Sequence, residues 1–466
     1  MSYKHHSARG SQTHANSQTQ DAASSQTSSG VQPAPQPSSS AQPASTASTN
    51  VLYVATSGSD SNAGTLDRPF KTISAAAKAA TPGTQILVRA GTYTDAVKIS
   101  NSGTASANIT IAPYGGEAVV LDGSKLPAKT DMVSIYGNYV SFKGFDVMNA
   151  TGHGIIAWAT HNVTISDNSV HGSRSGGIWV GGDVAGQSYS NTIHGNTVYN
   201  NVLLNQSHSS SSGWPEAVQA YKSDNTQITG NTVYNNQGEG IGSLISRGVQ
   251  ISQNTVHDNF SVNVYLDNAP DTVVDRNFIY STGNSMYFIN GHAAEGIAAA
   301  VESYSTQLPL TNLKVTNNVD VGDDYGFYYG AYGHGGGMQN ALIANNTFVN
   351  NGRSALHIDA AAGNSGNNVF NNIFYSGASK TLASGSAAGS VLRNNLWSGG
   401  SHTGFAGSGD VNADPKLASP GSLTPAGYHL LSGSPAAGAG SATSAVSADF
   451  SGASRTSPLS IGAFQH

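Results

Sequence analysis

A short phrase centred on asparagine recurs along the middle of the chain, and this repetition constrains the fold more than any other feature. From about residue 140 to residue 396, an apolar residue is followed by two variable residues, an asparagine, a variable residue and another apolar residue. Clear copies centre on Asn168, Asn196, Asn231, Asn254, Asn277, Asn346, Asn372 and Asn395, with a degenerate copy at Asn318. Because an internal repeat determines the whole fold, we interpret it before any local pattern.

The period of the repeat selects the architecture. Asn231, Asn254 and Asn277 are about 23 residues apart, which is typical of one β-helix coil built from three short strands. A propeller blade needs roughly 40 residues, and the Leu-x-x-Leu-x-Leu pattern of leucine-rich repeats is absent. The sequence therefore predicts an all-β, right-handed parallel β-helix of about 10–12 coils. We expect the asparagines to be structural, each tolerating a left-handed turn and bonding to the next coil to form a ladder.

Two segments before the repeats have a different character. Residues 1–49 are almost entirely Ser, Gln, Thr, Ala and Pro, which bury too little apolar surface to fold, so we predict a disordered tail. We assign residues 50–466 to a single β-helix domain. The run VLYVA from Val51 predicts a strand, and DRPFKTISAAAKAATPG predicts a short capping helix that ends at Pro82-Gly83.

Composition excludes several classes of protein. Only 10% of the residues are charged, and the net charge of −6 with a pI near 6.2 argues against nucleic acid as a partner. The chain has no cysteine, which excludes disulfides and thiolate metal sites. No run of about 18 apolar residues predicts a membrane span. The opening MSYKHHSARG lacks the apolar core of an ordinary secretory signal.

A second strand precedes each asparagine phrase, and aligning its copies separates an inner from an outer face. The copies are HGIIAW, GGIWVG, EAVQAY, EGIGSL, VNVYLD, EGIAAA, YGFYYG and SALHID. The inner face carries Ile155, Ile178, Val218, Ile241, Val264, Ile297, Phe327 and Leu356. The outer face carries the candidate substrate-binding residues Trp158, Trp179, Gln219, Tyr221, Tyr265 and His357. Contiguous exposed aromatic residues indicate a binding strip, here for sugar rings, unless the insertions fold over them as a satellite core.

Carboxylates on successive coils supply the candidate chemistry. Glu216, Glu239 and Asp267 would lie about 4.8 Å apart per coil, close enough to raise each other's pKa or to hold a cation. Lys222 and Arg247 lie nearby in the sequence, and either one is a candidate base for removing the proton next to a uronate carboxyl. This combination predicts a polysaccharide lyase acting by β-elimination, or a uronan epimerase. The alternatives are an inverting glycoside hydrolase using two of the carboxylates, and a non-catalytic carbohydrate-binding or surface solenoid.

Both ends of the predicted domain resemble one family. The features are the segment DRPFKTI, the strand GTY and the continuation ITIAPYG near the beginning, and Asp449, Gly452, Arg455, Ile461 and Gly462 near the end. In these residues at both ends, the chain resembles the pectate-lyase-like β-helix proteins, particularly the group containing the family 9 polysaccharide lyases. The resemblance implies a right-handed β-helix, an extracellular or cell-surface location, a polysaccharide substrate and possible Ca²⁺ dependence. The segment Asp323-Asp324-Tyr325-Gly326 matches the aspartate cluster of the family only in part, so the metal ligands stay unknown, and we expect a monomer.

Overall fold

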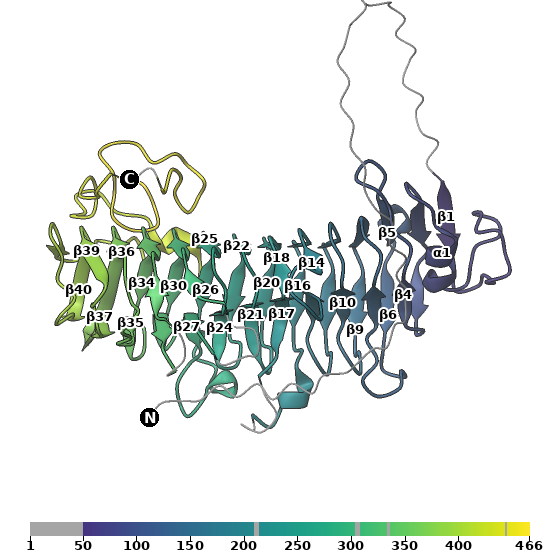
Figure 1. Ribbon diagram of the computed structural model, residues 1–466, viewed down its shortest axis with the longest axis horizontal. Coiled ribbons are helices and arrows are strands. Elements are labelled where there is room, and N and C mark those ends of the chain that lie inside the picture. Colours follow the sequence, from purple (N-terminus) through teal and green to yellow (C-terminus); the bar gives the residue numbers. More distant parts are fainter. Residues whose placement is uncertain (1–49, 209–213, 303–307, 333–335, 443–444) are drawn as a thin grey trace, which may run out of the picture.

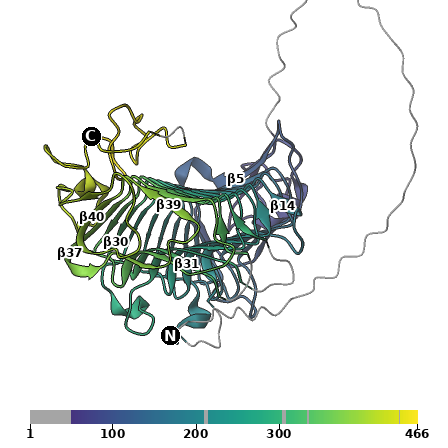
Figure 2. The same ribbon diagram turned by 60° about the vertical axis from the view of Figure 1, so that its left-hand side comes forward.

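The structure is a computed structural model, and it describes residues 50–208, 214–302, 308–332, 336–442 and 445–466 (Figure 1). The predicted tail, residues 1–49, lies outside these residues. Nearly all of the described chain is short strands that pair in parallel with the equivalent strands of neighbouring coils. The coils stack into a long parallel β-helix, as the repeat predicts. Figure 2, viewed more nearly along the axis, shows the successive strands in line with one another.

Three parallel sheets run along the β-helix, with 13, 13 and 11 strands. Sheet A contains, in spatial order, β1 (Val51–Val54), β2 (Gln85–Val88), β5 (Ile109–Pro113), β8 (Val140–Lys143), β11 (Thr164–Ser166), β15 (Thr192–His194), β19 (Gln227–Thr229), β22 (Gln250–Ser252), β25 (Val273–Asp275), β29 (Lys314–Thr316), β33 (Leu342–Ala344), β36 (Asn367–Phe370) and β39 (Ser390–Arg393). Sheet B contains β3 (Gly91–Tyr93), β6 (Val119–Asp122), β9 (Asp146–Met148), β12 (Ser169–His171), β16 (Thr197–Tyr199), β20 (Thr232–Tyr234), β23 (Thr255–His257), β26 (Phe278–Tyr280), β30 (Val319–Val321), β34 (Thr347–Val349), β37 (Ile373–Thr381), β40 (Leu396–Ser401) and β41 (Val411–Asn412).

Sheet C is the sheet that carries the candidate site. It contains β4 (Val97–Ile99), β7 (Val133–Ile135), β10 (Ile155–Trp158), β13 (Ile178–Gly181), β17 (Glu216–Tyr221), β21 (Glu239–Leu244), β24 (Val262–Asp267), β27 (Glu295–Ala300), β31 (Tyr325–Gly330), β35 (Ser354–Ile358) and β38 (Ala383–Gly385). The remaining elements are two small sheets, one helix and four 3-10 turns: β14 (Ser188–Tyr189) with β18 (Ser223–Asp224), β28 (Leu310–Thr311) with β32 (Met338–Gln339), α1 (Ile73–Ala79), η1 (Tyr114–Gly116), η2 (Leu203–Asn205), η3 (Ser285–Tyr287) and η4 (Pro425–Tyr428).

The capping helix α1 closes the first coil, as the sequence predicts. The Thr72 hydroxyl accepts a hydrogen bond from the backbone N–H of Ala75, which is the usual N-cap arrangement. The carboxylate of Asp60 in turn accepts from the backbone N–H groups of Lys71 and Thr72. Ile73 and Ala77 lie on the buried face of the helix and cover the open end of the core.

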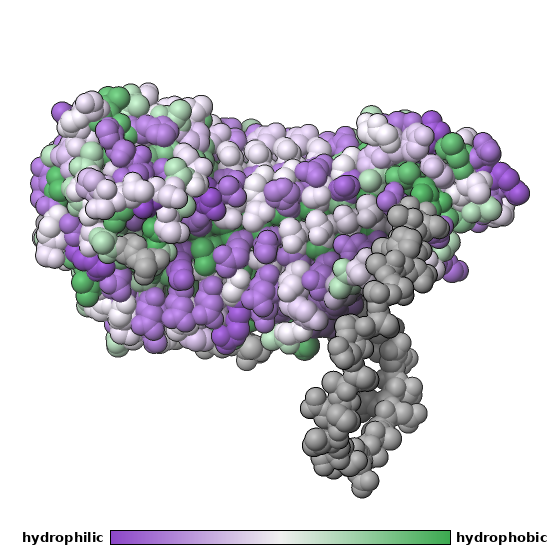
Figure 3. Space-filling view, turned by 90° about the horizontal axis from the view of Figure 1, so that it is seen from above, coloured by the Kyte–Doolittle hydropathy of each residue, from purple (hydrophilic) through white to green (hydrophobic). Residues whose placement is uncertain are grey.

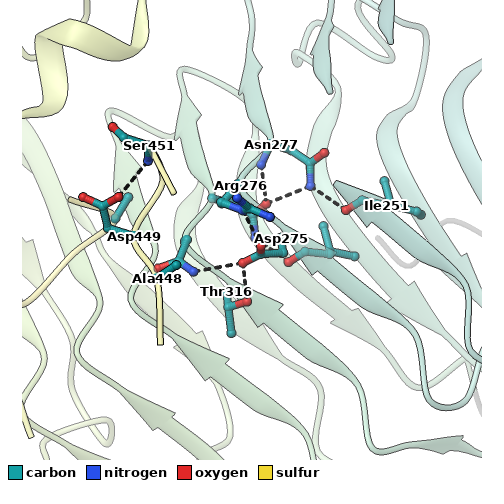
Figure 4. A network of polar contacts seen from close by, with 12 residues as sticks. Ile251, Asp275, Arg276, Asn277, Thr316, Ala448, Asp449 and Ser451 are labelled. Carbon is teal, nitrogen blue, oxygen red and sulfur yellow. Dashed lines mark hydrogen bonds and ion pairs between the residues drawn. The ribbon is translucent and has the colours of Figure 1, made fainter. Parts of the chain in front are cut away.

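The repeated asparagines form a continuous buried ladder. At each step, the backbone N–H and the side-chain amide of one asparagine donate to the side-chain oxygen of the equivalent asparagine in the next coil. Asn277 extends the ladder to Asn318, and its amide also donates to the Ile251 carbonyl (Figure 4). The predicted ladder is confirmed with one correction: the left-handed residue is the one before each asparagine, such as Gln253 with φ 58°.

Breaking the ladder at its middle is expected to destabilise the protein strongly. The Asn254 side chain accepts two hydrogen bonds from Asn231, and its amide donates to Asn277 and to the Ile228 carbonyl. We expect Asn254→Ala to lower the free energy of unfolding by about 3–5 kcal/mol, because buried donors lose their acceptors. Urea unfolding measures this effect. Asn368→Ala, at a half-buried strand position outside the ladder, is the control, and equal losses in both variants would contradict the role of the ladder.

The C-terminal segment, drawn in yellow in Figure 1, folds back over the outside of the last coils. Arg455 fastens it by donating to the Asn317 side chain and to the carbonyls of Gly462 and Ala463. Asp449 accepts backbone N–H bonds from Ser451 within the same segment, beside the Asp275 and Arg276 pair of the coil (Figure 4). Figure 3 shows the molecule from above, where the surface is largely hydrophilic. The C-terminal segment covers one end of this surface. The residues of the C-terminal family motif are therefore structural.

Candidate functional site

The predicted alignment of the sheet C strands is confirmed by their register. Each of the eight residues predicted to point inward pairs with its equivalent in the next coil, and all eight are fully buried. The neighbouring outward position is occupied along the sheet by Ile156, Trp179, Gln219, Gly242, Tyr265, Ala298, Tyr328, His357 and Ser384. Outward side chains separated by many residues in the sequence are thus brought onto one face.

A sharp bend places a row of glutamates at the edge of this face. Glu216, Glu239 and Glu295 each open a strand, and Glu216 pairs directly with Glu239. The next residue points into the core: a Cβ on Gly240 would lie 2.4 Å from the Asn263 carbonyl, and one on Gly296 would lie 1.8 Å from Asp320. In the three coils with these glutamates the residue at this inner corner is Ala217, Gly240 or Gly296, whereas β24 has the buried Asn263 there. The glutamate just before it is therefore directed outward.

Four carboxyl groups and a tyrosine form an acidic cluster, which we define as Glu216, Glu239, Asp267, Glu302 and Tyr265. All five are almost completely buried. Glu216 accepts a short hydrogen bond from the Gln219 amide. The Tyr265 hydroxyl donates to Glu302 at 2.6 Å, and the backbone N–H of Glu302 donates to Asp267 at 3.1 Å. These hydrogen bonds join Tyr265, Glu302 and Asp267, and electrostatic interactions link Glu239 to Glu216, Glu302 and Asp267 on the outer side of sheet C.

Burial and mutual repulsion change the protonation of the acidic cluster. Burial raises the pKa of Glu239 well above its ordinary value, and the charges of Glu216, Glu302 and Asp267 raise it further. Burial also raises the pKa of Tyr265, with a smaller contribution from Asp267. Both effects favour the protonated form of Glu239. A protonated carboxyl beside carboxylates is the arrangement that general acid and base catalysis requires.

Gly242 provides the space in which Glu216 lies. A Cβ at this position would lie 2.6 Å from Cγ of Glu216 and 3.0 Å from its Cδ. We expect Gly242→Ala to displace the Glu216 carboxylate and to lower any activity of the site by about 10- to 100-fold. Steady-state kinetics with circular dichroism as a folding check measure this. Gly377→Ala is the matched control, since a Cβ there would meet neighbours only at 3.8 Å, and a variant as active as the control would exclude the positioning role.

The predicted aromatic strip divides into two parts. Trp158 stacks on Tyr221 with ring centroids 6.2 Å apart, across Gly181, and both rings are half-buried. Trp179 donates from its indole nitrogen to the Glu216 carbonyl. Tyr265 instead packs with Val262, Ala298 and Ala300 beneath Tyr328 and Tyr332. Trp158, Trp179 and Tyr221 therefore keep half-buried rings, whereas Tyr265 belongs to a satellite core, the alternative that the sequence left open.

His357 lies at the far end of the same face. Its ring stacks on Tyr328 at 5.0 Å, and its two nitrogens contact the Ser384 hydroxyl and the Asp359 carboxylate. Gln219 is fully buried between Glu216 and the sheet.

The structure brings the three predicted carboxylates together but directs the two predicted cations elsewhere. Lys222 has φ 48°, and this left-handed turn directs its amine onto the Asp183 carbonyl and over the Tyr221 ring. Arg247 is half-exposed and lies 3.8 Å from Asp271. The four neighbouring charges that raise the pKa of Glu239 are all carboxylates. The role of either cation as a base stays a prediction.

The Ca²⁺ dependence that the family resemblance implies stays a prediction. Within the residues that the structure describes, no three His, Asp or Glu side chains converge in a way that would hold a metal ion. In the partial family motif, Asp323 turns into the core and accepts from Asn263, while Asp324 pairs with Arg353.

Sequence reasoning missed Glu302 and Tyr332. Both follow strands of sheet C and belong to insertions that break the repeat period, so alignment could not place them. The signal for Glu295, by contrast, was present, because EGI occurs at both Glu239 and Glu295.

Comparison with known proteins defines the class. Residues 52–268 match a family described as a Pel9A-like, right handed beta helix region, and residues 205–360 match a right handed beta helix region. The protein is a right-handed parallel β-helix, and the predicted resemblance to pectate-lyase-like β-helix proteins is confirmed.

Individual relatives match over different lengths. The uncharacterized protein YwoF of Bacillus subtilis (strain 168) is 25% identical over 341 residues, which cover 66% of this chain and 70% of YwoF. Pectate lyase PEL9 of Emericella nidulans is 46% identical over 78 residues, which cover 16% of this chain and only 19% of that enzyme.

Solved structures show the same fold at low identity. The complex of XylC with xylose has a TM-score of 0.57 at 14% identity, covering 79% of this chain and 87% of XylC. PfbA, a surface adhesin of Streptococcus pneumoniae, has a TM-score of 0.54 at 11% identity, covering 70% of this chain and 85% of PfbA. At these identities the likeness concerns the fold alone. Among the described residues, no helix has the length and apolar character needed to cross a membrane.

Proposed function

We propose that the protein binds a polysaccharide along the outer face of sheet C and cleaves its glycosidic bonds at the acidic cluster. The observation that carries this proposal is the buried carboxyl group of Glu239, which lies beside Glu216 and Asp267 and has a raised pKa. The half-buried pair of Trp158 and Tyr221 supplies rings on which sugars stack. The stretch shared with pectate lyase PEL9 supports a carbohydrate polymer as the substrate class.

Hydrolysis is the reaction that the geometry favours. Glu239 gives its proton to the glycosidic oxygen as the bond to the anomeric carbon breaks. Glu216 or Asp267 accepts a proton from the water that attacks this carbon, so that both products are neutral. Gln219 fixes Glu216, and the Glu302 backbone fixes Asp267, so neither carboxylate has to reorganise during the reaction. Within the cluster, Tyr265 packs against Ala298 and Ala300 on the side of β27. We therefore place the glycan on the opposite side, next to Trp158.

β-Elimination is the second candidate, and the similarity to pectate lyases favours it. In this reaction Lys222 or Arg247 would remove the proton next to a uronate carboxyl, and the leaving sugar would depart with an unsaturated bond formed in the product. The proposal requires one of these side chains to leave its present contact on the Asp183 carbonyl or near Asp271. Geometry therefore favours hydrolysis and similarity favours elimination.

One experiment separates these reactions. The protein is incubated with neutral polymers such as xylan and arabinan and with acidic polymers such as pectate and alginate. Reducing ends and the ultraviolet absorbance of unsaturated ends are followed in parallel. Reducing ends without absorbance indicate hydrolysis, and both signals together indicate elimination. Binding without either signal indicates a non-catalytic solenoid and contradicts cleavage.

A further inference from the structure

Apart from the acidic cluster, Asp324, Arg353 and His292 form another group of ionisable side chains on the same edge of sheet C. The proposed reaction does not use them. Asp324, between β30 and β31, has a side chain only 1% exposed, yet it holds two basic side chains that reach the surface. Arg353 contacts Oδ2 of Asp324 through both Nε and Nη2, and His292 Nδ1 lies 3.3 Å from Oδ1. The side chains of Arg353 and His292 remain 35% and 44% exposed.

The local backbone fixes both basic residues. His292 closes a hairpin on Ile289, and the two turn residues Asn290 and Gly291 both have positive φ, as this tight turn requires. The backbone N–H of Arg353 donates to the Asp324 carbonyl at 2.8 Å. Its guanidinium lies 4.6 Å above the Tyr325 ring. The two donors are therefore held in place before any ligand arrives.

Glu295 lies near Asp324 and Arg353, and its carboxyl group does not repel an anion bound there. Its Oε2 is buried and has no hydrogen-bond partner among the described residues. Burial and the nearby Asp324 raise the pKa of Glu295 to about 8, although Arg353 offsets part of this rise. At neutral pH Glu295 is therefore uncharged, and its carboxyl is able to donate a hydrogen bond.

The chemistry of these groups suits an oxyanion with several oxygens. A guanidinium carries five N–H donors in a planar fork, and the contacts with Asp324 use only those on Nε and Nη2. We propose that Arg353 and His292, held by Asp324, form a subsite that binds a carboxylate or sulfate group of an acidic polysaccharide lying along sheet C. This inference rests on the proposed function and names its substrate class.

The register places the subsite at a useful distance from the acidic cluster. Glu239 opens β21, and Asp324 directly precedes β31, three strands further along sheet C. Three coils correspond to about 14 Å along the axis. A charged group bound there would set the position of a polymer chain without contacting the bond that is cleaved.

The test measures binding separately from cleavage. Affinity electrophoresis of the full chain is run in gels containing polygalacturonate, carboxyl-reduced polygalacturonate, dextran sulfate or dextran. We expect Arg353→Gln to weaken binding to the anionic polymers about tenfold and His292→Gln severalfold, with no change for the uncharged polymers. Arg89→Gln, which removes a comparable arginine paired with Glu117 at the other end of the molecule, is expected to bind like the wild type.

The two variants differ in their expected effect on folding. Arg353→Gln leaves buried Asp324 without its ion pair, so His292→Gln, at a surface position, carries the test if the first variant loses its native circular dichroism. Unchanged binding of folded His292→Gln and Arg353→Gln overturns the subsite, as does equal weakening in Arg89→Gln. Selective loss of anion binding in a protein that cleaves no polymer supports the subsite and contradicts the proposed function. Preference for dextran sulfate over polygalacturonate assigns the anion as a sulfate.

Discussion

Glu239→Gln is expected to abolish almost all activity while leaving the fold intact. Removing a general acid costs about 10²- to 10⁴-fold in kcat, and the reason lies in the position of the group. Glu239 is buried and its raised pKa favours the protonated form, so a neutral amide has nearly the same shape and charge but has no proton to transfer to the leaving oxygen. The measurement is the initial rate on the best polymer of the panel, with urea unfolding alongside.

The control for this variant is Glu117→Gln, on the opposite end of the β-helix. Glu117 accepts two hydrogen bonds from Arg89 and lies on the surface, so its loss is expected to leave the rate unchanged. The pH profile provides a second readout. In the wild type, activity is expected to fall on the alkaline side as Glu239 loses its proton, and this limb is expected to disappear in the residual activity of Glu239→Gln. A variant with wild-type kcat would exclude Glu239 as the acid.

The acidic cluster could be predicted because its position follows from repetition. The asparagine phrase sets the length of a coil, and the strand before it sets the register, so Glu216 and Glu239 had to become neighbours. The glycine after Glu239 reinforces this, because a Cβ at that position would lie 2.4 Å from the Asn263 carbonyl. Periodicity thus determines both the core and the direction in which these carboxylates point.

Residues outside the repeat could not be placed in this way. Lys222 follows Tyr221 directly, but a left-handed backbone at that residue turns its amine away from the carboxylates. Glu302, Tyr332 and His292 lie in insertions of unequal length, where no partner coil fixes the register. Arg353 adjoins a strand, yet its role appears only when Asp324 of the preceding coil is seen beside it. Contacts between coils, rather than local sequence, make these sites.

Asp320 is a charged residue type at a position of the repeat where other coils have an apolar side chain. Its burial leads to the second large effect that we expect. Asp320 on β30 pairs with Ile279 on one side and Phe348 on the other, at an inward position of sheet B. It is fully buried, and burial raises its pKa to about 7. Asn351 donates to it at 2.5 Å, and Asp323 lies in hydrogen-bonding contact with it. A carboxyl group whose pKa is raised by burial therefore occupies a place in the core where other coils have an aliphatic or aromatic side chain.

This arrangement makes stability depend on pH in a definite direction. In the unfolded chain Asp320 releases its proton near its ordinary pKa of 3.8, whereas the folded protein keeps it up to about pH 7. The folded state thus binds more protons between these values, and its stability is expected to fall as the pH rises through this window. Asp323, Glu239 and Glu295 act in the same direction, because burial raises the pKa of each.

Asp320→Asn tests this expectation, because an amide stays neutral at every pH. Urea unfolding is measured at several pH values between about 4 and 8, for the variant, for the wild type and for Asp67→Asn at an exposed position. The variant is expected to lose less stability than the wild type towards pH 8, while Asp67→Asn follows the wild type. Wild-type stability that is constant or rises through the window would contradict a buried proton on Asp320. A variant that keeps the full wild-type slope would assign the proton to Asp323, the other member of the buried pair.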